Sequence, residues 1–99
     1  MKNLVHIKDF QKTVFTYKDF TVKVTSIKDP WKYSIDSVNV RYRITDNLRP
    51  EETILTSDWV SGCYYFNAVD LNNFKDIVTG GIDKVLKGGY REQPNYYKK

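Results

Sequence analysis

The 99-residue chain has one cysteine, one histidine and no long apolar run, and each of these shortages excludes a class of protein. A single cysteine, Cys63, excludes an internal disulfide and any cysteine-rich metal site. No apolar stretch approaches the roughly 20 residues of a membrane-spanning helix, and the first residues lack the apolar core of a signal peptide. We therefore expect a cytoplasmic protein with no membrane partner.

The residues that carry out catalysis are equally scarce. His6 is the only histidine, and a catalytic base needs a nucleophile placed beside it. Cys63 lies in an apolar run with no charged residue within four positions, so no neighbour in the sequence would stabilise a thiolate. The glycine pairs Gly80-Gly81 and Gly88-Gly89 match no phosphate-binding loop, and no acidic spacing matches a metal site. The sequence predicts a protein that is not an enzyme and that has no cofactor, metal or small-molecule substrate.

A strictly alternating segment within Ser34 to Thr45 predicts the central strand of an antiparallel sheet. From residue 38 onward its apolar side chains point one way and its polar side chains the other. The apolar set is Val38, Val40, Tyr42 and Ile44, and the polar set is Asn39, Arg41, Arg43 and Thr45. One face of this strand should be buried, and the other should meet solvent.

Shorter segments on both sides complete the predicted sheet. Two β-rich runs separated by Lys18-Asp19 indicate a hairpin, and Asp29-Pro30 begins a loop, because the residue before a proline avoids helical conformation. Residues 2–12 fit a short helix, although alternation in the same segment fits a strand. The expected elements are the hairpin strands Thr13–Tyr17 and Phe20–Ile27, a polar connection over Asn47–Glu52, and strands over Ile54–Val60 and Cys63–Asn67 with a turn or bulge at Ser61-Gly62.

Helical spacing of apolar residues predicts one long helix near the C-terminus. The apolar stripe consists of Leu71, Phe74, Ile77, Val78, Ile82, Val85 and Leu86. Asp70 is placed to cap the helix, Val69 and Phe74 stand at the positions of a hydrophobic staple, and Gly88-Gly89 should end it. Gly80-Gly81 in mid-helix is interpreted as close packing of the helix against the sheet, with close approach of a partner as the alternative.

Together these patterns predict a single domain over residues 1–99 with an α+β fold. An antiparallel sheet of about four to five strands would pack against one main C-terminal helix, with a short N-terminal helix added. The tail, residues 90–99, is expected to be frayed unless its tyrosines dock on the domain.

Charge is distributed unevenly, which indicates candidate binding surfaces. Residues 1–50 carry ten Lys and Arg against five Asp, whereas residues 51–87 carry three Lys against six Asp and Glu. The solvent face of the sheet should show Arg41, Arg43 and Lys23, with Trp31 and Tyr33 at its edge. Cations interleaved with aromatic rings on a sheet are typical of proteins that bind single-stranded nucleic acid.

A second candidate surface is the loop after the central strand, which carries Asp46, Asn47, Glu51 and Glu52. This loop also belongs to a series of short motifs. They are Lys18-Asp19-Phe20-Thr21-Val22-Lys23-Val24, Ser34-Ile35, Val40-Arg41, Asp46-Asn47, Ile77-Val78, Ile82 and Lys87-Gly88-Gly89-Tyr90. In this order they resemble a family of small phage-encoded anti-CRISPR proteins that inhibit the Cas9 nuclease.

The resemblance implies a compact α+β domain with a short N-terminal helix, a three-stranded antiparallel sheet and C-terminal helices. It also implies a non-catalytic protein that acts in the bacterial cytoplasm by covering the DNA-recognition surface of the nuclease with acidic side chains. On this chain, Asp46 and Asn47 coincide with the family's polar turn, and Glu51 and Glu52 follow it. The chain differs from the family in its basic charge and in extra residues from about Arg49 to Tyr65, enough for one more strand.

Three functions therefore remain open at the level of the sequence. The first is stoichiometric binding of a host or bacterial defence protein such as a Cas9-type nuclease, through Asp46, Asn47, Glu51 and Glu52. The second is binding of single-stranded nucleic acid, through Lys23, Trp31, Tyr33, Arg41 and Arg43. The third is a phage structural or assembly role, which would require self-association.

Overall fold

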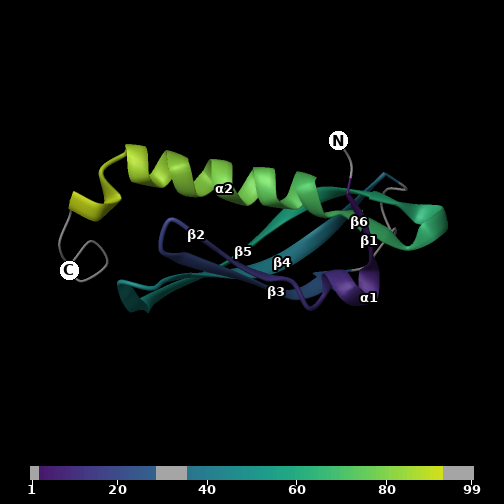
Figure 1. Cartoon of the computed structure of the whole chain (residues 1–99), viewed down its shortest axis with the longest axis horizontal. Helices are drawn as coiled ribbons and strands as arrows, with labels where there is room; N and C mark the ends of the chain where they lie inside the picture. The colour runs from purple at the N-terminus through teal and green to yellow at the C-terminus, as the bar shows by residue number, and fades with distance from the viewer. Residues whose placement is uncertain (1–2, 29–35, 93–99) are drawn as a thin grey trace.

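A computed structural model describes residues 3–28 and 36–92 and contains an antiparallel sheet covered on one face by a helix (Figure 1). The predicted α+β class is confirmed. The described residues form six strands rather than four or five, in the order β1-β6-β5-β4-β3-β2. The elements are β1 (Leu4–His6), α1 (Ile7–Phe10), β2 (Val14–Tyr17), β3 (Phe20–Lys28), β4 (Ser37–Asp46), β5 (Arg49–Cys63), the 3-10 turn η1 (Tyr64–Phe66), β6 (Ala68–Asp70), α2 (Leu71–Lys87) and the 3-10 turn η2 (Tyr90–Glu92).

The centre of the sheet follows the predicted alternation. Val38, Val40 and Tyr42 of β4 are buried, while Arg41 and Arg43 between them are exposed. β4 pairs with β3 on one side and with β5 on the other, so it lies inside the sheet. The β2–β3 hairpin is confirmed as well. Lys18 and Asp19 both adopt positive φ, 47° and 68°, which suits a two-residue turn matched to the twist of the strands.

The predicted short N-terminal helix is present as the four residues Ile7–Phe10 of α1, and Leu4–His6 before it forms a strand by antiparallel pairing with β6, so both structures that fit this segment occur in it. The predicted turn or bulge at Ser61-Gly62 is wrong. Ser61 and Gly62 form no turn but belong to one 15-residue strand, β5. Pairing of Ser61 with Ser37, and of Gly62 with Val69, holds these residues extended.

The connection after β4 is also shorter than predicted. Asn47 and Leu48 alone turn the chain, and β5 begins at Arg49 rather than after Glu52. At the other end of β5 the predicted strand over Cys63–Asn67 is instead the 3-10 turn η1, followed by Asn67 with a φ of 46°. A left-handed residue there redirects the chain into β6.

The core lies between the sheet and α2, around Phe74. This ring is fully buried and packs edge-on against three other rings, with centroid distances of 5.1 Å to Phe10, 6.2 Å to Phe15 and 5.3 Å to Tyr42. The predicted start of α2 is confirmed, because the Asp70 side chain accepts a hydrogen bond from the Asn73 N–H. The same Asp70 oxygen accepts a second hydrogen bond, from the N–H of Asn3.

The end of α2 agrees with the predicted glycine stop. Gly88 caps the helix and Gly89 adopts a φ of 89°, a backbone conformation that glycine reaches without strain. The interpretation of Gly80-Gly81 as a place where α2 packs closely against the sheet is wrong, however. Gly80 and Gly81 are exposed, and a Cβ built at either position would meet nothing within 4 Å.

Replacing Gly81 by alanine should therefore raise the free energy of unfolding by up to about 1 kcal/mol. Alanine has the higher helix propensity, and its methyl group would enter open space. Chemical denaturation of both proteins measures the difference. Gly89→Ala is the matched control and should destabilise the protein, because a φ of 89° strains any residue with a Cβ. A fall in stability for Gly81→Ala would show that the helix backbone is constrained there after all.

Candidate nucleic-acid interface

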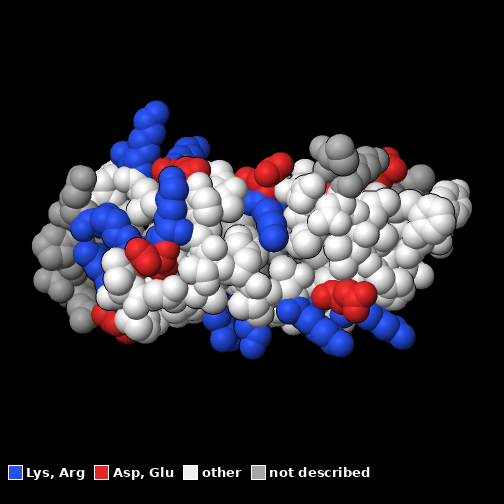
Figure 2. Space-filling model, in the orientation of Figure 1, with Lys and Arg blue, Asp and Glu red and all other residues white. Residues whose placement is uncertain are grey.

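The solvent face of the sheet carries a group of cations that comes from two neighbouring strands. We call Lys23 and Lys28 of β3 and Arg41 and Arg43 of β4 the basic face. All four side chains are exposed. Lysine and arginine side chains project below the sheet, away from α2, along the lower margin of Figure 2. Of the residues predicted for this surface, Lys23, Arg41 and Arg43 are brought together, whereas Trp31 and Tyr33 lie outside the described residues.

Strand register arranges this face in rows across β3, β4 and β5. Residues directly opposite each other in an antiparallel pair have neighbouring side chains on the same face. Going from the end of β4 that adjoins the turn toward its other end, the rows are Thr21–Thr45–Thr53, Lys23–Arg43–Leu55, Ser26–Arg41–Ser57 and Lys28–Asn39–Trp59. The cations therefore form a band, with hydroxyl groups between them and the exposed side chains of Leu55 and Trp59 along one side.

Two of these cations, Lys23 and Arg43, face each other directly across β3 and β4. Like charges in that arrangement destabilise a sheet. Ion pairs in the described part of the chain involve other cations, namely Lys18, Arg49 and Arg91, so the positive charge of the basic face is not neutralised within those residues. The Lys23–Arg43 pair therefore carries a stability cost at a solvent-exposed position.

The same face is hollowed. A shallow open depression of about 580 Å³ is lined by Thr25, Ser26, Arg41, Arg43, Leu55 and Ser57, among others. Its floor is the sheet itself, so its shape is set by backbone pairing rather than by a mobile loop. The depression presents guanidinium groups and hydroxyl groups together, a combination suited to an anionic, hydrogen-bonding ligand.

The second predicted surface, the acidic loop, does not form, because two of its four predicted contact residues are buried. Asp46 is 1% exposed and Glu52 8% exposed, so the prediction that these carboxylates lie on the surface is wrong. The Tyr90 hydroxyl lies 2.9 Å from a carboxylate oxygen of each, and its single proton is donated to one of them at a time. The Arg91 guanidinium lies 2.6 Å from the other Asp46 oxygen.

The hydrogen bonds of this cluster lower the pKa of the Asp46 carboxyl. Burial opposes its ionisation, but hydrogen bonds from Arg91, from Tyr90 and from the Leu48 N–H outweigh burial, so the pKa of Asp46 lies below its ordinary value. Burial also raises the pKa of the Tyr90 phenol, and the hydrogen bonds to Asp46 and Glu52 raise it further. Asp46 and Glu52 are therefore structural groups. Of the four predicted contact residues, only Asn47 and Glu51 are exposed.

The first residues of the tail follow the alternative expected for it, since Tyr90 docks on the domain together with Arg91. Tyr90 is buried and Arg91 is half-buried, with its guanidinium 4.6 Å from the centroid of the Phe20 ring. The rest of that tail, residues 93–99, lies outside the described residues. Local sequence patterns give no indication of this contact, because its partners are far apart in the chain: Tyr90 is 44 positions from Asp46 and 38 from Glu52.

The His6 ring accepts a hydrogen bond from the Lys8 N–H and caps α1, and Cys63 is a half-buried free thiol at the end of β5. Within the described ranges, no three His, Cys, Asp or Glu side chains are grouped as metal ligands. No helix in that part of the chain combines the length and the apolarity that crossing a bilayer requires.

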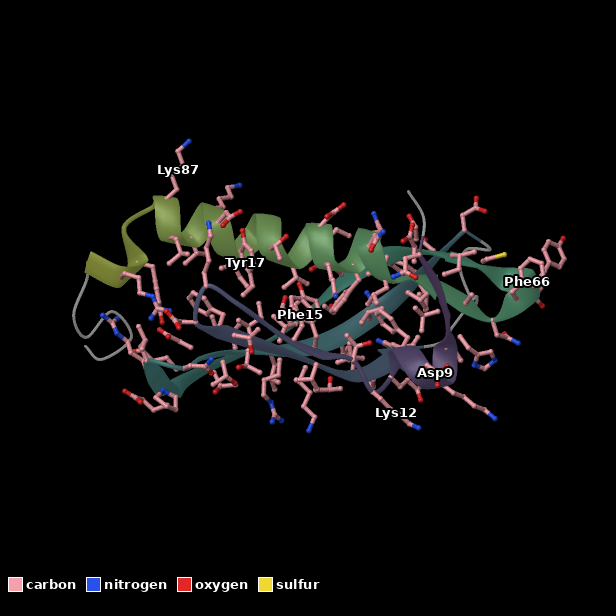
Figure 3. All side chains as sticks on the ribbon, in the orientation of Figure 1. Asp9, Lys12, Phe15, Tyr17, Phe66 and Lys87 are labelled. Carbon is pink, nitrogen blue, oxygen red and sulfur yellow. The ribbon has the colours of Figure 1, made fainter. Side chains whose placement is uncertain are left out.

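Sequence reasoning missed two groups of surface residues. Lys28, Leu55 and Trp59 were not assigned to the solvent face, although pairing with the outward-facing Asn39 and Arg43 of β4 places them there. The exposed aromatic residues Tyr64, Tyr65 and Phe66 were assigned to a strand but lie on η1, at the end of the molecule where Figure 3 labels Phe66.

Comparison with known proteins finds no matching family model, no similar curated protein and no similar solved structure. Function is therefore inferred from the geometry of the surface.

Proposed function

We propose that the protein is a non-catalytic binder of single-stranded nucleic acid that uses the basic face. The observation that carries this proposal is the direct opposition of Lys23 and Arg43, with Arg41 in the next row. Cations that form no ion pair within residues 3–28 and 36–92, on a hollowed sheet surface, attract phosphate groups, and hydroxyl groups beside them donate further hydrogen bonds.

The spacing of the cations on the basic face supports contact with the sugar-phosphate backbone of an extended single strand. Arg41 and Arg43 lie two residues apart on one strand, about 7 Å along it, which is comparable to the separation of successive phosphates in an extended single strand. Trp59 is 51% exposed and lies in the row of Lys28, so its ring can stack on a base while neighbouring cations hold the backbone.

Replacing both Arg41 and Arg43 by glutamine should weaken binding of a labelled single-stranded oligonucleotide by roughly tenfold or more at low salt. Each lost phosphate contact should also reduce the slope of log affinity against log salt by about 0.7. Fluorescence anisotropy over a series of salt concentrations measures both quantities. Trp59→Ala should weaken binding by about 1–3 kcal/mol per stacked base while leaving the slope unchanged.

Lys84→Gln with Lys87→Gln is the matched control, since it removes the same charge from the last turn of α2 (Figure 3 shows Lys87 pointing away from the sheet). This control should retain most of the affinity. Two results would overturn the proposal: no binding at micromolar protein and low salt, or an equal loss of affinity in the control.

Stoichiometric inhibition of a defence protein such as a Cas9-type nuclease stays a prediction. The fold restricts the acidic loop to Asn47 and Glu51 as possible contacts, because Asp46 and Glu52 are buried. Measuring cleavage by a purified nuclease in the presence of this protein tests that alternative separately from oligonucleotide binding.

A further inference from the structure

A small hollow lies between the C-terminal half of α2 and the sheet, on the opposite side of the sheet from the basic face. We call it the helix-side hollow. Its lining consists of Phe20, Ile44, Glu52, Ile54, Gly81, Ile82, Val85 and Tyr90. Its volume is about 70 Å³, which is room for about five non-hydrogen atoms. The lining side chains are apolar except for the Glu52 carboxylate and the Tyr90 hydroxyl.

Burial of the lining residues divides the helix-side hollow into a closed end and a mouth. Glu52 and Tyr90 are both buried, so the two polar groups are at the closed end. Ile54 of β5 is 44% exposed and Val85 of α2 is 49% exposed, and Gly81 is exposed as well. A ligand would therefore enter between β5 and α2 and reach Glu52 past apolar side chains.

The buried carboxylate at the closed end uses only one of its two oxygens. The Tyr90 hydroxyl lies 2.9 Å from Glu52 Oε2, and the Arg49 guanidinium lies 3.8 Å from the same oxygen. Within residues 3–28 and 36–92, no group donates a hydrogen bond to Oε1. A buried acceptor without a donor costs free energy, and a ligand that supplied the donor would remove this cost.

Gly81 leaves the mouth of the helix-side hollow open. Gly81 and Val85 are one turn apart and lie on the same side of α2. A Cβ at position 81 would meet nothing within 4 Å, so packing does not require a glycine there, although glycine lowers helix stability. The missing side chain gives an aliphatic group free access to the closed end.

We propose that the helix-side hollow binds a primary alkylammonium group, that is, a protonated amine on a short aliphatic chain. The ammonium group donates hydrogen bonds to Glu52 Oε1 and to the Tyr90 oxygen, and the aliphatic chain contacts Ile54, Ile82 and Val85. A guanidinium group fits less well, because it carries more N–H donors and would leave some of them unpaired among apolar side chains. A neutral apolar group would leave Oε1 without a donor. This binding is independent of what the basic face binds.

Titration of the isotope-labelled protein with n-butylamine at neutral pH should cause saturable shifts of the amide resonances of Ile54, Gly81 and Val85. A dissociation constant in the millimolar range is expected, because few ligand atoms are covered. n-Butanol has the same aliphatic chain without the charge and should bind about tenfold more weakly or not at all. Ammonium chloride has the charge without the chain and should cause no saturable shift. Tighter binding of acetyl-lysine methylamide than of n-butylamine would assign the site to a lysine side chain of a partner protein, and the reverse would assign it to a free amine.

Two variants test the residues of the helix-side hollow. Glu52→Gln keeps an oxygen for the Tyr90 hydroxyl but removes the charge, and it should raise the dissociation constant of n-butylamine by about tenfold or more. Gly81→Leu should have a similar effect, because its side chain covers the mouth. Gly80→Leu is the matched control, since Gly80 is an exposed neighbour that does not line the hollow, and it should bind n-butylamine as the native protein does. Melting curves would show that all three variants are folded.

Three results would overturn the proposal. The first is equal affinity of the native protein for n-butanol and n-butylamine, a comparison that needs no variant. The second is normal binding of n-butylamine by folded Glu52→Gln. The third is an equal loss of affinity in Gly80→Leu and Gly81→Leu.

Discussion

Replacing Phe74 by alanine should lower the free energy of unfolding by about 3–5 kcal/mol. The ring is fully buried where α2 meets the sheet, and it packs edge-on against Phe10, Phe15 and Tyr42. Its loss would remove contacts that join α1, β2, β4 and α2 in one place. For a domain of ordinary stability, 5–15 kcal/mol, this change should bring the protein close to unfolding at room temperature, as urea denaturation would measure.

The stability of Asp70→Ala should be compared with that of Phe74→Ala. Loss of a helix N-cap costs about 0.5–2 kcal/mol, and the additional hydrogen bond from Asn3 places Asp70 toward the upper end of that range. The protein should remain folded. If Asp70→Ala were the more damaging change, the centre of the core would not be at Phe74, and Asp70 would belong to a more extensive buried polar site.

Replacing Asp46 by alanine should destabilise the protein by roughly 3 kcal/mol. This change leaves the Arg91 guanidinium and the Leu48 N–H without Asp46 as acceptor and the Tyr90 hydroxyl with Glu52 in its place. Removing one partner of a buried ion pair is more damaging than removing both. Arg91 is partly exposed, which keeps the expected loss at the lower end of values for buried pairs. Glu51→Ala, an exposed neighbour, should change stability by less than about 0.5 kcal/mol.

The pH dependence of Asp46→Asn provides an independent test of this cluster. The pKa of Asp46 is lower in the folded protein than its ordinary value, so ionised Asp46 contributes stability above the unfolded-state pKa of about 3.9. That contribution is lost as the pH falls through the folded-state pKa. The difference in free energy of unfolding between the native protein and Asp46→Asn should therefore be largest near neutral pH and become smaller as the pH falls into the acid range. A difference that stays constant down to the lowest accessible pH would show that the charge of Asp46 has no role.

Local periodicity predicted the parts of the fold that depend on nearby residues. Alternation along residues 38–44 located β4 and its buried face, and Asp70 marked the first turn of α2. Lys18-Asp19 located the hairpin turn. In each case the determining interactions lie within a few positions along the chain, so the pattern of side chains is sufficient to reveal them.

The candidate site was predicted in part for the same reason. Lys23, Arg41 and Arg43 share a face because alternation places them there, and only the register of β3 on β4 remained to be found. The exposure of the acidic loop was predicted wrongly because burial of Asp46 and Glu52 depends on Tyr90 and Arg91, which lie in η2, after the end of α2. A charged residue beside a turn is normally exposed, and nothing local distinguishes one that a distant phenol will cover.

By itself, then, the sequence determined the α+β class, the central strand, the start and end of the main helix and the sign of charge on the solvent face. Only the tertiary structure decided that β5 runs unbroken through Ser61 and Gly62, that Leu4–His6 joins the sheet and that Asp46 is buried. These outcomes rest on contacts between residues far apart in the chain, where pairing and desolvation outweigh local preference.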